Sequence, residues 1–272
     1  MRPEGRAFGL LAPLAAVALL LGAWELAARW DVLSDALGIE PFLIPSPSEI
    51  GAALWRDRDL LAEDSLVTAV EIVLGLAIAL LVGLGAALAL HASTWMRRAF
   101  LPLLIASQTI PIVAIAPILV VWFDYGIGPK LAIVALVCFF PITVNGLDGL
   151  RSVDPALRRT LLTLHASRAQ VLRRVELPSA LPFVFSGLRI AAVVAVIGAV
   201  FAEWSGSSSG LGHLILTAQG QLQTARVFAA IVCLSMIALA LYAALGLAER
   251  LICPWTREPR RAALTPRKES PR

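Results

Sequence analysis

The chain carries the stretch VTAVEIVLGLAIALLVGLGAALAL at residues 67–90, in which Glu71 is the sole charged residue. A membrane-spanning helix needs about 20 consecutive apolar residues to cross a hydrocarbon layer about 30 Å thick. This stretch is long enough, and it lacks the polar face that a helix at the surface of a soluble protein shows. The sequence therefore predicts a membrane-spanning helix here, with Glu71 near one end, where its side chain can reach polar surroundings.

Five further stretches of similar character lie on either side of this one. The composition agrees, because 58% of the residues are hydrophobic and 15% are charged, whereas soluble domains are about a quarter charged. The first stretch follows Arg2 and Arg6 as a signal peptide would, but no convincing small-residue cleavage site follows it, so we interpret it as an uncleaved helix. We predict an all-α membrane protein with six spans, at residues 8–28, 67–90, 100–123, 129–147, 183–202 and 227–248.

The Lys and Arg residues are distributed unequally between the two sides of these spans. With the N-terminus in the cytoplasm, 18 of the 23 lie inside, and the outer five are Arg29, Arg56, Arg58, Lys130 and Arg226. Cytoplasmic loops of membrane proteins carry such an excess. We predict a multi-pass membrane protein with both termini in the cytoplasm. The same distribution accounts for the net charge of +4 without nucleic-acid binding.

The connections complete the predicted organisation. Residues 1–7 form a cytoplasmic N-terminus, residues 8–252 a membrane domain, and residues 253–272 a disordered basic cytoplasmic tail. The outer stretch IPSPSE at residues 44–49 predicts a turn followed by a helix start. The inner segment at residues 149–182 is long, basic and helical in pattern.

This inner loop contains RSVDPALRRTLLTLHASRAQVLRRVELP at residues 151–178. Asp154 before Pro155 predicts a helix start, because Asp caps free N–H groups and Pro is tolerated at the first helical position. A second helical stretch runs from Arg168, and we expect Pro178 to end it. The pattern predicts two short helices joined near His165 and projecting into the cytoplasm, an arrangement suited to docking into a groove on a soluble partner.

The loop resembles that of the permease subunits of binding-protein-dependent ABC importers. That family carries Glu-Ala-Ala, three residues, Gly, nine residues, Ile, any residue and Leu-Pro. His165 stands at the Gly position, the run Ala166, Ser167 and Arg168 matches the residues that commonly follow it, and Val175–Pro178 match the end. The family's Gly serves a turn with positive φ, which His adopts more readily than most other residues.

The first half of the motif departs from the family. Arg159, Thr160 and Leu161 occupy the Glu-Ala-Ala positions, which leaves open whether this chain keeps any salt bridge that the family's Glu makes.

Other motifs extend the resemblance over nearly the whole chain. Pro45-Ser46-Pro47 is similar to an outer turn of the family, and Gly210-Leu211-Gly212 is typical of the subgroup that imports nitrate, sulfonates, taurine and pyrimidine precursors of thiamine. The stretches at 138–142 and 195–204, together with Asn145, are most similar to permeases of the hydroxymethylpyrimidine type.

The resemblance implies a type I ABC importer permease of MetI-like fold, which would form the path of a small polar solute. It also implies a homodimer embedded in the lipid of the bacterial inner membrane, two cytoplasmic ATPase subunits and a periplasmic or lipid-anchored substrate-binding protein. The chain has no Gly-x-x-x-x-Gly-Lys-Ser/Thr phosphate loop, so we expect no enzymatic activity and no cofactor. The residues expected to couple to the ATPase are Leu161, Leu164, His165, Ala166, Ser167 and Arg168.

Three polar residues are candidates for the translocation path. Gln108 and Asn145 are uncharged polar residues within apolar spans and lie beside prolines. They could bind a polar heterocycle, or they could form hydrogen bonds that hold the helices together. Glu203 follows the fifth span at the outer mouth, where it is either a gate or a solvated carboxylate.

Two other classes of function fit the sequence less well. An intramembrane enzyme needs a constellation of catalytic residues, but the predicted topology separates His91, His165 and His213 across the membrane. The three cysteines form no CxxC motif, and no metal site is expected. A secondary transporter commonly shows repeated halves, and no internal repeat is visible here.

Overall fold

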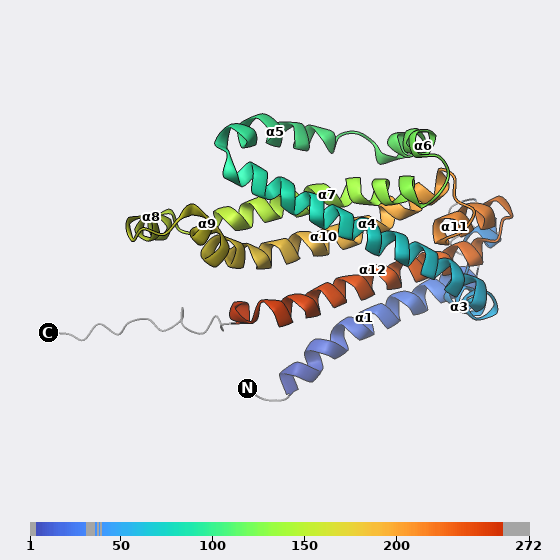
Figure 1. The fold of residues 1–272 in the computed structure, drawn as a ribbon. Helices are drawn as coiled ribbons and strands as arrows, with labels where there is room; N and C mark the ends of the chain where they lie inside the picture. Colours follow the sequence, from blue (N-terminus) through green and yellow to red (C-terminus); the bar gives the residue numbers. More distant parts are fainter. Residues whose placement is uncertain (1–3, 31–35, 37, 39, 258–272) are drawn as a thin grey trace. The chain divides into compact units, whose positions relative to one another are not determined.

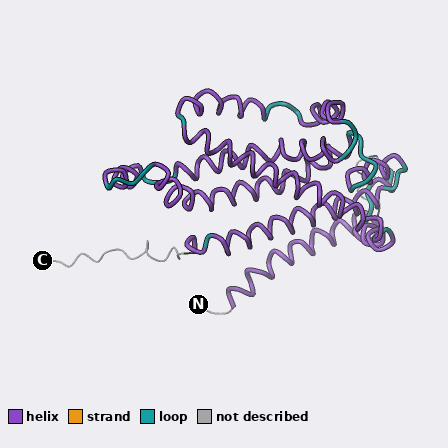
Figure 2. Tube along the Cα trace, viewed as in Figure 1, coloured by secondary structure: helices purple, strands orange, loops and turns teal. Residues whose placement is uncertain are grey.

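The computed structural model describes residues 4–257 except 31–35, 37 and 39, and these residues are almost entirely helical (Figures 1 and 2). Figure 2 shows no strand in the described part of the chain, so the predicted all-α class is confirmed. The elements are α1 (Glu4–Arg29), η1 (Pro41–Leu43), α3 (Pro47–Arg56), α4 (Arg58–Ala92), α5 (Thr94–Ser107), α6 (Ile112–Phe123), α7 (Ile127–Arg151), α8 (Pro155–Thr163), α9 (Arg168–Val171), the π-helix η2 (Leu172–Glu176), α10 (Leu177–Trp204), α11 (Leu211–Gly220), α12 (Thr224–Ile252) and η3 (Pro254–Arg257).

Four helical stretches in the described residues are long and apolar enough to cross a membrane. They are α4, α7, α12 and the continuous stretch Arg168–Trp204, which ends in α10. Four of the predicted spans each lie inside one of them. A fifth crossing results if α5 and α6 together count as one broken span. The remaining predicted span, at residues 8–28, falls within α1, which is 26 residues long.

The predicted span at residues 100–123 is wrong as a continuous helix. α5 ends at Ser107 and α6 begins at Ile112. Pro111 stands just before α6, and its ring nitrogen has no hydrogen to donate to the preceding turn. The helix therefore stops, and Gln108 lies in the break between α5 and α6 rather than inside a helix.

The predicted helix start in the IPSPSE stretch is confirmed at α3. The Ser46 hydroxyl accepts a hydrogen bond from the Glu49 backbone N–H, and the Glu49 carboxylate accepts one from the Ser46 N–H at 2.8 Å. This reciprocal capping box satisfies two backbone donors, and Pro47 occupies the first helical position. Local sequence is enough to fix this boundary.

The chain divides into two compact units, and α4, α7, α10 and α12 each contribute residues to both. Unit 1 comprises residues 1–78, 110–137 and 194–239, and unit 2 comprises residues 79–109, 138–193 and 240–272. Apolar side chains of α3, α11 and α12 form a core in unit 1. In unit 2 the buried core joins α4, α7 and α10 through Ala87, Leu90, Leu147, Leu150 and Ala180.

Close helix contact supports the core of unit 2. A Cβ atom added to Gly149 of α7 would lie 2.9 Å from the Cα of Ala180 in α10, so a larger residue would force these helices apart. Large apolar side chains also cover the outside of the helices, with Leu81 75% exposed in α4. Such a surface suits a hydrocarbon environment rather than water.

The predicted terminal segments lie largely outside the described residues. Within the tail predicted at 253–272, Pro254–Arg257 form the short helix η3, and residues 258–272 are outside the described part. Of the predicted N-terminal segment, residues 1–3 are outside it.

Candidate functional site

The loop at residues 149–182 forms a helical hairpin that Figure 1 shows beyond the ends of α7 and α10. Asp154 caps α8, because its carboxylate accepts a hydrogen bond of 2.7 Å from the Ala156 N–H. Ser167 caps α9 through a bond of 3.2 Å from the Gln170 N–H to its hydroxyl. The predicted pair of short helices is confirmed, and both starts follow from local capping chemistry.

The turn between these helices is left-handed at His165, whose φ is +65°. The His165 N–H donates to the Leu162 carbonyl at 3.1 Å, and the Ala166 N–H donates to the Leu161 carbonyl at 3.1 Å. This pair of bonds is a Schellman motif, which satisfies the last free carbonyls of α8. The positive φ expected at the position of the family's Gly is confirmed with His in its place.

The tip of the hairpin presents apolar side chains to solvent. Leu164 is 71% exposed, and Leu157 and Leu162 are also exposed. Exposed leucines gathered on one short element are typical of a surface that another protein covers. The structure brings four of the six predicted coupling residues to one pocket of about 320 Å³, namely Leu161, Leu164, His165 and Ala166. Ser167 is engaged as the cap of α9, and Arg168 lines a different pocket.

The expectation that Pro178 ends the second helix is wrong. The π-helix η2 continues from α9 directly into α10, and the Leu177 N–H bonds the Leu172 carbonyl five residues earlier. The wider π turn moves aside the carbonyl with which a proline ring would clash in a regular α-helix. Pro178 therefore sits in the first turn of α10 without breaking it.

A buried carboxylate that sequence reasoning missed connects three elements of unit 2. Glu176 of η2 is 3% exposed, and its two oxygens contact the His91 Nε2 at 3.0 Å and the Arg158 Nε at 3.2 Å. His91 lies at the end of α4 and Arg158 in α8. The reversed charge at Arg159 therefore does not leave the hairpin without a salt bridge, because the neighbouring Arg158 makes one. The available signal was an acidic residue, Glu176, two positions after the Arg173-Arg174 pair.

The two uncharged path candidates have different surroundings within unit 2. Gln108 is exposed in the break after α5, so it does not lie within a continuous helix. Asn145 is half-buried in α7, and its side-chain N–H donates to the Pro141 carbonyl of the same helix at 2.8 Å. A Cβ at Gly187 of α10 would lie 2.9 Å from the Asn145 Cβ, so this side of α7 packs closely against α10.

Glu203 is 1% exposed, and the reading of it as a solvated carboxylate is wrong. The Thr68 hydroxyl donates to one of its oxygens at 2.7 Å. The backbone N–H groups of Gly212 and His213 donate to the other oxygen. These N–H groups belong to the first turn of α11, where a carboxylate meets both free donors and the positive end of the helix dipole. Glu203 thus fixes α11 within unit 1.

Further polar contacts surround this carboxylate. Glu71 is 2% exposed rather than extended toward polar surroundings at the span end, and its carboxylate accepts from the Lys130 ammonium at 2.6 Å. Lys130 also donates to the Ser207 hydroxyl at 2.7 Å. Asp64 accepts from the Gly210 N–H at 2.8 Å. Because these partners lie far apart in sequence, no local pattern indicated the network.

Comparison with known proteins adds an independent finding. The family profile described as "Binding-protein-dependent transport system inner membrane component" matches residues 79–254. A Haemophilus influenzae protein named as a probable ABC transporter permease is 42% identical over 86% of this chain and 93% of its own length. The formylaminopyrimidine transport permease ThiX of Halalkalibacterium halodurans is 38% identical over 93% of this chain and 99% of its own.

A third relative and a solved structure are also similar. The riboflavin transport permease RibX of Chloroflexus aurantiacus is 36% identical over 83% of this chain and 85% of its own. The crystal structure of an amino acid ABC transporter with histidines superposes with a TM-score of 0.58 at 15% identity, over 75% of this chain and 97% of that chain. This last similarity concerns the fold.

Proposed function

Because this chain belongs to the family of binding-protein-dependent ABC transporter permeases, we propose that it forms the import path of a hydroxymethylpyrimidine-type thiamine precursor. Such a solute is a small polar heterocycle that carries no permanent negative charge. The alternatives within the family are sulfonates, taurine and nitrate, all of which are anionic or carry an anionic group.

The observation that carries the proposal is the pairing of the cations within the predicted spans. These cations are Lys130 and Arg189. Lys130 pairs with Glu71 at 2.6 Å in unit 1, and Arg189 pairs with Glu249 in unit 2. A permanently anionic solute would favour an unpaired cation in its path, whereas hydrogen bonds suffice for a neutral heterocycle. Two relatives are named for the transport of formylaminopyrimidine and of riboflavin, and these names support a nitrogen heterocycle.

The proposal includes the assembly in which the chain works. Two copies of the chain form the path, two ATPase subunits bind in the cytoplasm, and a substrate-binding protein delivers the solute outside. ATP hydrolysis belongs to the ATPase subunits. Both chain termini are then cytoplasmic, as the distribution of Lys and Arg favours. The exposed leucines at the hairpin tip support docking of the ATPase there, through Leu161, Leu164, His165, Ala166, Ser167 and Arg168.

Within this proposal, Gln108 and Asn145 are the residues that hydrogen-bond the solute in the path. Gln108 is exposed in a helix break, and its side-chain N–H donates to the neighbouring Ser107 hydroxyl at 3.4 Å, a local bond that a solute could replace. Glu203 was also a candidate for the path. Its carboxylate accepts hydrogen bonds from Thr68 and from the first turn of α11, all within unit 1, so Glu203 supports the path indirectly by holding α11 in place.

An uptake assay tests the substrate. Proteoliposomes that contain the chain and its ATPase, with the partner binding protein added, should accumulate labelled hydroxymethylpyrimidine or formylaminopyrimidine when ATP is present on the ATPase side. Taurine and nitrate should accumulate no faster than without ATP. ATP-dependent uptake of taurine or nitrate without uptake of either pyrimidine would refute the substrate and leave the permease role intact. Riboflavin is the third arm, because it separates pyrimidines from larger heterocycles.

A further inference from the structure

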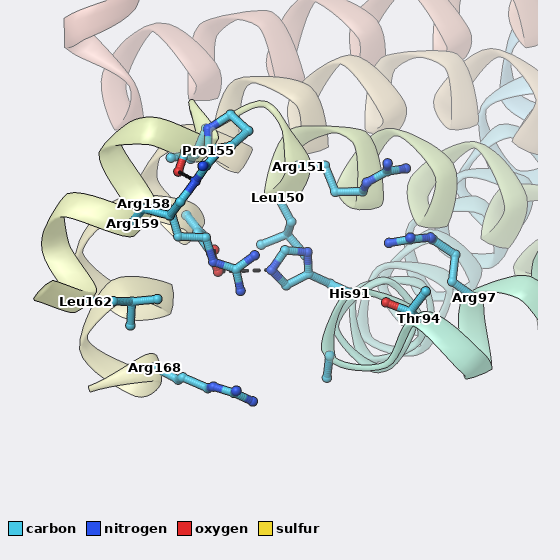
Figure 3. Close-up of a pocket in the computed structure, with 13 residues that line it drawn as sticks. His91, Thr94, Arg97, Leu150, Arg151, Pro155, Arg158, Arg159, Leu162 and Arg168 are labelled. Carbon is cyan, nitrogen blue, oxygen red and sulfur yellow. Dashed lines mark hydrogen bonds and ion pairs between the residues drawn. The ribbon is translucent and has the colours of Figure 1, made fainter. Parts of the chain in front are cut away.

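A pocket of about 630 Å³ in unit 2 is lined by five arginines (Figure 3). They come from three separate parts of the chain: Arg97 from α5, Arg151 from the end of α7, and Arg158, Arg159 and Arg168 from the hairpin. His91 and Glu176 also line the pocket, and Glu176 is its single carboxylate. The hairpin tip residues Leu164, His165 and Ala166 line a different pocket, and of the six residues proposed to dock the ATPase only Arg168 lines this one.

Within the described part of the chain, carboxylates balance only part of the positive charge of this pocket. Glu176 is already engaged by His91 and Arg158. Arg159 donates a hydrogen bond to the Pro155 carbonyl of its own helix, which leaves its charge unopposed. Among the residues that the structure describes, Arg97, Arg151 and Arg168 have no carboxylate partner. Guanidinium groups brought together in this way repel one another, and a bound anion would relieve the repulsion.

The placement of the side chains suits a phosphate group. Figure 3 shows the Arg97 and Arg151 guanidinium groups to one side of His91, with Arg158 on the other side. The Thr94 side chain lines the same region and can donate a hydrogen bond. Arginine is the residue best suited to phosphate, because its planar group donates two parallel hydrogen bonds to two oxygens.

We propose that this pocket binds a phosphate-bearing anion, with Arg97 and Arg151 as its main ligands. The phosphate can belong to a lipid headgroup or be free inorganic phosphate. An apolar pocket of about 370 Å³ is adjacent, since Leu150 lines both pockets, and Leu84, Leu88 and Val184 also line it. An acyl chain could occupy that second pocket while the headgroup meets the arginines, whereas free phosphate would use the arginines alone.

Binding to the full-length chain in detergent tests the site. One arm measures retention of phosphatidylglycerol by native mass spectrometry, with phosphatidylcholine as the zwitterionic comparison. The other arm measures inorganic phosphate by equilibrium dialysis in the absence of added lipid. Arg97→Gln and Arg151→Gln should each weaken the binding about tenfold, because each removes a charge-assisted hydrogen bond. Binding by the unmodified chain should also weaken as salt rises.

The matched control is Arg98→Gln, which removes the same charge from the next residue of α5. Arg98 is exposed and does not line the pocket, so its variant should bind as the unmodified chain does. Retention of phosphatidylglycerol alone identifies a lipid headgroup, and binding of phosphate alone identifies the free anion; either supports the site. Thermal unfolding without ligand shows whether each variant is folded. If the Arg97→Gln variant does not fold, the Arg151→Gln variant carries the test.

Two results would overturn the proposal. One is that the unmodified chain binds neither probe, or binds it no more tightly than the Arg97 and Arg151 variants. The other is that these two arginines prove to contact an acidic segment of the ATPase in the assembled transporter, and that neither probe competes with that segment.

Discussion

Asp57, which caps α3, accepts two hydrogen bonds from the Arg226 guanidinium, at 2.8 and 3.1 Å. These bonds lower the pKa of Asp57 from its ordinary value of 3.8, although partial burial acts in the opposite direction. Because the pKa is lowered on folding, the carboxylate stabilises the folded chain fully above pH 3.8, and this contribution is lost as the pH falls toward the folded-state pKa.

We therefore expect Asp57→Asn to have a lower thermal unfolding temperature than the unmodified chain at pH 6. The difference between the two unfolding temperatures should shrink as the pH falls below 3.8. The measurement is thermal unfolding in detergent between pH 6 and pH 3. Asp59→Asn is the control, because the Asp59 side chain is 91% exposed. A difference that does not change with pH would contradict the assigned role of the ion pair.

Glu203 gives a second expectation at the scale of single residues. In Glu203→Gln the amide oxygen can replace one carboxylate oxygen, but the NH₂ group cannot replace the other as an acceptor. Either the Thr68 hydroxyl or the N–H groups of α11 then lose their acceptor. We expect a loss of about 1–3 kcal/mol in the free energy of unfolding, the usual cost of unpaired buried donors. Glu63→Gln, at an exposed position of the same unit, should change stability by less than about 0.5 kcal/mol. Equal losses in the two variants would show that Glu203 caps nothing.

At the scale of elements, the pair between Arg158 and Glu176 joins α8 to η2. A double-mutant cycle with Arg158→Gln and Glu176→Gln measures the coupling between them. Glu176 is buried and Arg158 is half-exposed, so we expect a coupling of about 0.5–1.5 kcal/mol in unfolding, above that of a fully exposed pair. Additive effects of the two substitutions would mean that the pair does not hold the hairpin.

The hairpin tip is where an interface with the ATPase is proposed. Ala166→Glu places a charge among Leu161, Leu164 and His165 in the tip pocket. We expect co-purification of the ATPase with this variant to fall at least tenfold, because a carboxylate pressed into an apolar contact loses its hydration. Ala166→Ser, which changes the size of the side chain little, should retain the partner. Full assembly and transport by the Ala166→Glu variant would contradict docking at this turn.

Element boundaries were predictable where the deciding chemistry is local. Asp154 before Pro155 indicated the start of α8, and the proline-punctuated IPSPSE stretch indicated that of α3, because turns and caps act within a few residues. The continuity across Pro178 was not predictable, since a π turn leaves no clear sequence signal. The break after Ser107 was missed because 100–123 carries no charge and is apolar on average despite Ser107, Gln108 and Thr109, and average hydropathy does not report helix direction.

At the scale of the whole molecule, the distribution of Lys and Arg predicts that both termini are cytoplasmic. A reporter enzyme active only in the periplasm, fused after Arg257, should therefore be inactive, and a fluorescent protein that matures only in the cytoplasm should be bright at the same position. The opposite pattern would reverse the topology. A fusion in the segment between α10 and α11, residues 205–210, serves as the control and should give the periplasmic result.

The fold class followed from composition and span length because both depend on the sum of many residues. The candidate site could be predicted from the sequence only in part. The turn at His165 could be predicted from motif spacing, whereas the partners of Glu176 and Glu203 could not, because His91 lies 85 residues from Glu176 and Thr68 lies 135 residues from Glu203. One sequence shows that such polar residues exist but not which of them meet.

These same separations set an order for biosynthesis. When α4 first leaves the ribosome, the partner of Glu71 is 59 residues away and still to be made, and the partner of Thr68 is later still. A carboxylate without a partner in a membrane helix costs about 2.5–3.5 kcal/mol when it lies at the helix centre, and less near an end. The early chain must therefore carry α4 in a poorly satisfied state until α7 and then α10 arrive. A nascent chain halted between α4 and α7 would expose Glu71 and Thr68 without their partners, and quality-control proteases of the membrane could recognise these unpaired groups.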